Sequence, residues 1–95
     1  MTKVEVHRQA DTLKQAAEKA ISQDQGSSTV GAATRGLVES LIREAKKLPG
    51  ISRVVADIQD SQPGLTWTEV LSITSTIYTA TAEAASAVYK PGFTS

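Results

Sequence analysis

The sequence predicts an all-α protein: a compact antiparallel helical bundle of three longer helices plus one short helix. Apolar residues recur at steps of three and four over long stretches, which is the period of an amphipathic helix. Residues suited to helix capping precede these stretches, and Pro-Gly pairs interrupt or close them. We expect helices near 3–24, 29–48, 51–59 and 66–89, within a single domain, 1–95.

In the first expected helix, 3–24, the apolar residues are spaced alternately four and three apart, as in a bundle helix. Val6, Ala10, Leu13 and Ala17 form this series, which ends at either Ala20 or Ile21. The polar residues 23–28 that follow are numerous enough to reverse the chain between neighbouring helices.

The second expected helix, 29–48, has the strongest apolar stripe. Its members are Val30, Leu37, Val38, Leu41, Ile42, Ala45 and Leu48. Gly26-Ser27-Ser28-Thr29 offers several N-cap residues, because a hydroxyl there accepts from the free N–H groups of the first turn. Pro49-Gly50 is expected to end the helix. Glu39 and Arg43 are one turn apart and are expected to form a surface ion pair.

The third stretch, 51–59, is short. Ile51, Val54, Val55 and Ile58 have helical spacing, although the β-branched residues raise the strand propensity. We favour a short helix, followed by a turn at Pro63-Gly64.

The last expected helix, 66–89, has a clear start. Thr66 and Glu69 fit a capping box, and Leu65 is placed to contact Val70 across it. The β-branched segment 72–81 leaves a strand as the alternative there. The capping box before it and the Ala-rich residues after it favour one continuous helix, which Pro91-Gly92 would close.

Composition excludes several classes of protein. The chain has 95 residues, of which 40% are hydrophobic and only 4% aromatic, so small side chains must let the helices approach closely. Ten cations balance ten anions, which removes any long-range attraction to nucleic acid or to a membrane.

Cysteine is absent, so disulfides and thiolate sites are excluded. No apolar run approaches the roughly 20 residues that span a bilayer. The first residues lack a signal peptide, so we expect a cytoplasmic protein, although a processed mature chain would look the same.

Catalytic and cofactor chemistry have little support. His7 is the only histidine and is expected to be exposed, so neither a His-based metal set nor a Ser–His–Asp triad is indicated. Gly31 and Gly36 are not followed by the Lys and Ser or Thr of a phosphate loop. We therefore predict no catalytic, cofactor-binding or metal-binding residues, and no enzyme.

Two features suggest binding instead. Small residues lie four apart in two rows, and such rows permit close packing either within the domain or against a second copy. The rows are Ala32, Gly36 and Ser40 in the second helix and Ser72, Thr76, Ala80 and Ala84 in the last. We predict a protein–protein interaction module, such as an adaptor, inhibitor, immunity-type or assembly protein, that forms a homodimer near one row.

The alternative is a small DNA-binding regulator. Arg43, Lys46, Lys47 and Arg53 flank the Pro49-Gly50 turn and could form a basic corner. The second helix of such a helix-turn-helix would be short and would offer few base-reading side chains, so a solvated helix face is the simpler interpretation.

Overall fold

The computed structural model describes residues 1–89 and, for 83–89, only the helical backbone. This part of the chain contains three helices. They are α1 (Lys3–Ser22), α2 (Ala32–Lys46) and α3 (Trp67–Tyr89). Within this described part there is no strand, only one isolated bridge between Thr29 and Thr66. The all-α prediction is confirmed. The predicted helix end at Pro91-Gly92 lies outside the described residues.

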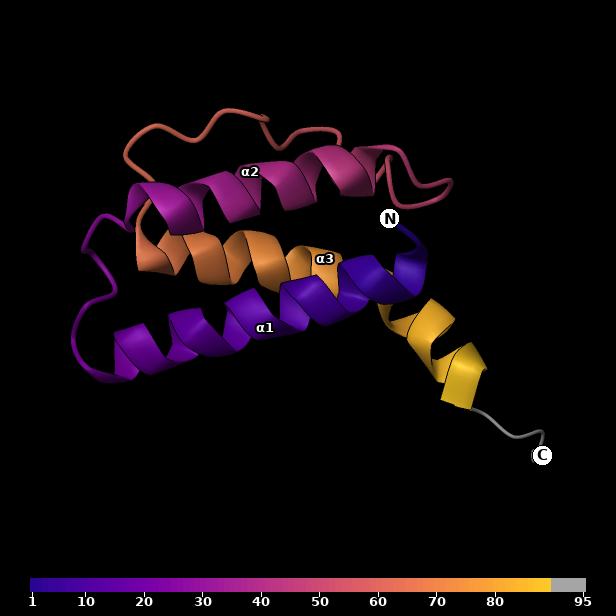
Figure 1. Ribbon diagram of the computed structural model, residues 1–95, viewed down its shortest axis with the longest axis horizontal. Helices are drawn as coiled ribbons and strands as arrows, with labels where there is room; N and C mark the ends of the chain where they lie inside the picture. The colour runs from indigo at the N-terminus through magenta and orange to yellow at the C-terminus, as the bar shows by residue number, and fades with distance from the viewer. Residues whose placement is uncertain (90–95) are drawn as a thin grey trace.

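The helices do not alternate in direction. Figure 1 shows that α1 runs opposite to the other two, whereas α2 and α3 run the same way. The segment 47–66, which we call the connecting segment, carries the chain back to the end where α2 begins. There the Val30 N–H donates to the Leu65 carbonyl (2.8 Å) and the Trp67 N–H donates to the Ser28 carbonyl (3.2 Å). The strictly antiparallel bundle is therefore not confirmed, because a long crossover replaces a tight turn.

The expected short helix at 51–59 is not confirmed either. Residues 50–57 form consecutive turns, in which N–H groups donate to carbonyls sometimes three and sometimes four residues back. Gly50, after the end of α2 and at the start of these turns, has a φ of +82°, a left-handed conformation that glycine adopts readily. A stretch this short and rich in β-branched residues has little helical stability of its own. Its spacing still serves the core, because Ile51 and Val55 are buried.

The core lies mainly where α1 packs on α3, the two helices in most extensive contact. The buried residues of α1 are the predicted series, which ends at Ala20 and not at the half-buried Ile21. Several of them are alanines, which allows the two helices to come close. Val70, Ile77 and the buried Thr74 and Thr81 face them from α3. Ile51, Val55 and Leu65 extend the core into the connecting segment.

The apolar face of α2 is narrower than predicted. Val38, Leu41, Ile42 and Ala45 are buried, but Leu37 is 49% exposed. Each residue turns a helix by about 100°, so Leu37 falls at the edge of a stripe centred on the other four. Part of the strongest sequence stripe therefore remains on the surface.

The β-branched residues of α3 are accommodated without breaking the helix. Three threonine hydroxyls donate to carbonyls four residues back: Thr74 to Val70 (2.7 Å), Thr76 to Ser72 (2.9 Å) and Thr81 to Ile77 (2.8 Å). This bonding lets a hydroxyl be buried with its hydrogen bond made. The continuous helix is confirmed over the alternative strand.

Side-chain caps fix two of the helix starts. At α3 the predicted capping box is present, since Glu69 Oε1 accepts from the Thr66 N–H (2.9 Å) and Thr66 Oγ1 accepts from the Glu69 N–H (3.3 Å). Thr2 and Glu5 form a second box at α1. The start of α2 has no side-chain cap and comes later than predicted, at Ala32, because the residues before it are extended against the start of α3.

Candidate functional site

His7 lies between α1 and α3, and the prediction that it is exposed is wrong. It is half-buried, its ring stacks on Tyr78 with centroids 4.2 Å apart, and its Nδ1 is 2.9 Å from Thr81 Oγ1. The Thr81 hydroxyl donates to the Ile77 carbonyl, so it accepts from His7 Nδ1–H. Lys14 Nζ lies 5.3 Å from the centroid of the Tyr78 ring. These contacts tie the start of α1 to the middle of α3.

The surroundings of His7 are structural in character. Thr81, the hydroxyl that contacts it, is fully buried and out of reach of a substrate. Among the described side chains, no three His, Asp or Glu residues are grouped so as to hold a metal ion. None of the helices in the described part combines the length and the apolar character needed to cross a bilayer.

The small row of α2 faces solvent. Ala32 and Gly36 are exposed and Ser40 is half-buried, and a Cβ built on Gly36 would meet no atom within 4 Å. The exposed Leu37 lies beside Gly36. We call these four residues the α2 outer face. None of the four belongs to the buried core.

The row on α3 has a different setting. Thr76 and Ala80 are half-buried and line a shallow groove of about 480 Å³ together with Ser75, Thr79 and Val54 of the connecting segment. Ser72, earlier in this row, is exposed, and the side chain of Ala84 lies outside the described residues. The two rows do not face each other, because Gly36 has open space where α3 would have to lie.

The basic corner is partly neutralised. Lys46 Nζ is 2.7 Å from Asp60 Oδ1, and Lys47 Nζ is 3.2 Å from Glu44 Oε2. Arg43 and Arg53 are exposed. A hydrogen bond from the Met1 amino group, and then one from Lys47, lower the pKa of Glu44, which stays ionised beside these cations.

Glu39 pairs differently from the prediction. Its Oε2 is 3.9 Å from Arg35 Nε and accepts the Gln62 N–H at 2.8 Å, so it helps to hold the connecting segment against α2. The predicted partner, Arg43, is exposed one turn further on.

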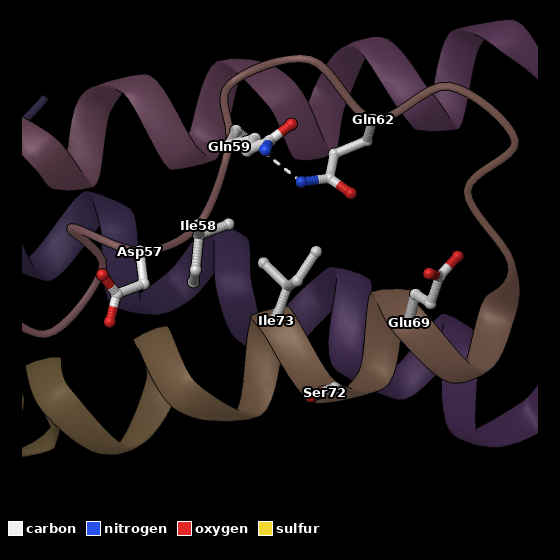
Figure 2. Close-up of a pocket in the computed structure, with 7 residues that line it drawn as sticks. All are labelled: Asp57, Ile58, Gln59, Gln62, Glu69, Ser72 and Ile73. Atoms are coloured by element: carbon white, nitrogen blue, oxygen red, sulfur yellow. Dashed lines mark hydrogen bonds between the residues drawn. The ribbon is translucent and has the colours of Figure 1, made fainter.

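A hollow of about 370 Å³ lies between the connecting segment and the first turns of α3 (Figure 2). We call it the segment pocket. Its lining residues are Asp57, Ile58, Gln59, Gln62, Glu69, Ser72 and Ile73. It could not be predicted from the sequence, because its two walls come from separate segments and neither carries a recognisable motif.

Comparisons of the chain with family models, with curated proteins and with solved structures find no match.

Proposed function

We propose that the protein is a non-enzymatic protein–protein interaction module of the adaptor, inhibitor, immunity-type or assembly kind, acting in the cytoplasm. The α2 outer face supports this proposal most directly. It combines small side chains with an exposed leucine and is left unused by the core. A surface of this kind lets a second helix approach closely and bury apolar area.

A second copy of the chain is our proposed first partner. A two-fold axis near Gly36 would bring the same face of both copies together, as in most homodimers. The α2 row suits this role better than the row on α3, where Ala80 already lies across a groove from Val54.

Light scattering at high micromolar concentration tests the homodimer. We expect the parent protein to be dimeric and Gly36→Leu to be a folded monomer, since a leucine there blocks close approach without touching the core. Gly36→Ala is the matched control: it keeps the row small, gains up to about 1 kcal/mol of helix stability and should stay dimeric. A monomeric parent would refute self-association. Ala80→Leu, made separately, asks the same question of the α3 row.

The alternative function, DNA binding through the basic corner, retains one favourable observation: Arg43 and Arg53 are exposed. An electrophoretic shift at low salt would test it. Saturable binding that weakens steeply with salt, and fails when Lys46, Lys47 and Arg53 become Ala, would favour this function over protein binding.

A further inference from the structure

The segment pocket has an apolar floor and a polar rim. Ile58 and Ile73 are half-buried and pack against the core, so they present a fixed apolar surface. Figure 2 shows Ile73 rising between the connecting segment and α3, with the amide of Gln62 on one side and the carboxylate of Glu69 at one end. Asp57 stands at the opposite end, with its carboxylate turned outward. An occupant with an aliphatic part and a polar head suits such a lining.

Two acceptor atoms on the rim, one on Glu69 and one on Gln62, are left to bond an occupant. Glu69 Oε1 is bonded to Thr66, which leaves Oε2 without a partner within the described part of the chain. Gln62 donates its N–H to Glu39 and its Nε2–H to the Gln59 carbonyl (2.7 Å), so its Oε1 remains to accept. A head group that fits these atoms must be a donor.

The charged side chains that line the segment pocket are both negative. Asp57 and Glu69 line it, and no Lys, Arg or His does. Lys46 of α2, which reaches the connecting segment, is already paired there with Asp60. A cationic donor is therefore favoured over a neutral one, and an anion is disfavoured.

We propose that the segment pocket binds an arginine side chain presented by a partner protein, an inference that rests on the proposed function. The aliphatic stem lies on Ile58 and Ile73, and the guanidinium donates to Glu69 Oε2 and Gln62 Oε1. A guanidinium carries several N–H donors in one plane, so it bonds acceptors from two elements at once, which a single ammonium point charge does less well.

A small probe tests the pocket without the partner. n-Butylguanidinium, titrated into ¹⁵N-labelled protein, should shift the amide signals of Gln62, Glu69 and Ile73, with a dissociation constant on the order of millimolar. n-Butylurea, a neutral molecule of similar shape, should bind at least about fivefold more weakly. Equal binding of the two, or shifts that centre elsewhere, would overturn the proposal.

Two matched variants test whether the carboxylate of Glu69 is the negative charge that binds the probe. Glu69→Gln removes the charge but keeps a side chain able to cap α3, and it should weaken n-butylguanidinium binding about fivefold or more. Glu18→Gln removes one negative charge on α1, outside the pocket lining, and should leave binding unchanged. Equal effects of the two variants would contradict a site at Glu69.

The probe measurement is independent of light scattering. A monomeric parent that binds the probe would therefore refute the homodimer without contradicting the proposed pocket.

Discussion

The ring of His7 stacks on that of Tyr78, 4.2 Å between centroids and 26° from parallel, and so joins the first turns of α1 to α3. The same ring bonds Thr81, which lies 74 residues away in the sequence. His7→Ala removes both contacts, and we expect it to lower the free energy of unfolding by about 1–2 kcal/mol. Arg8→Ala, at the exposed neighbouring position, should change it by about 0.5 kcal/mol or less. Urea unfolding of both variants checks this, and equal stabilities would contradict a structural role for His7.

Two leucines of α2 should differ sharply in their contribution to stability. Leu41 is 1% exposed and Leu37 is 49% exposed. Leu41→Ala leaves a cavity in the core and should cost about 2–5 kcal/mol. Leu37→Ala should cost about 0.5 kcal/mol or less when unfolding is measured at low micromolar concentration, where the proposed dimer is dissociated. A large loss from Leu37→Ala under those conditions would place that side chain in the core.

Periodicity in the sequence predicted α1 and α2, and together with the capping box at Thr66 it predicted α3. The spacing of Val6, Ala10, Leu13 and Ala17 depends only on the helix period, so it identified the buried face of α1 directly. The same spacing at 51–59 did not produce a helix, because the stretch is short and rich in β-branched residues. Burial and helix formation are separate consequences of one apolar pattern.

Features that depend on distant contacts could not be predicted. The shared direction of α2 and α3 follows from backbone hydrogen bonds such as Val30 to Leu65, which leave no periodic trace in the sequence. The burial of His7 depends on Tyr78 and Thr81, far along the chain. The segment pocket likewise lies between two stretches of the chain, neither of which carries a recognisable binding motif. The row of small residues that includes the exposed Gly36 was, by contrast, already visible in the sequence from its spacing of four.

The capping box at α3 gives a third prediction. Thr66→Ala removes the hydroxyl that accepts the Glu69 N–H and should cost about 1 kcal/mol in urea unfolding. Glu69→Gln keeps an acceptor for the Thr66 N–H and should cost about 0.5 kcal/mol or less. If Glu69→Gln lowers the free energy of unfolding as much as Thr66→Ala does, the charge of Glu69 matters more to the cap than its hydrogen bond.

Acid should weaken the corresponding cap at α1. The Thr2 N–H, and then its hydroxyl, hold the pKa of Glu5 below its ordinary value of 4.5. A carboxyl whose pKa is lower in the folded state stabilises the fold above the unfolded-state pKa, and this stabilisation is lost as the pH falls through the folded value. We expect the urea midpoint to fall as the pH decreases below about 4.5, and to fall less in Glu5→Gln. Identical pH profiles for the two proteins would show that this carboxyl is not involved.

The two fully buried threonines of α3 provide the final test. Thr74 and Thr81 each donate to a carbonyl four residues back, but only Thr81 also accepts a hydrogen bond from His7. Valine has nearly the shape of threonine, and a hydroxyl bonded only to its own helix contributes little net stability. Thr74→Val should therefore leave the free energy of unfolding within about 0.5 kcal/mol of the parent. Thr81→Val leaves the His7 Nδ1–H facing a methyl group and should cost about 1–2 kcal/mol.

In the His7→Ala background the cost of Thr81→Val should largely disappear, as a double-mutant cycle requires of two directly coupled side chains. A cost that persists undiminished in that background would show that Thr81 acts through packing and not through its bond to His7.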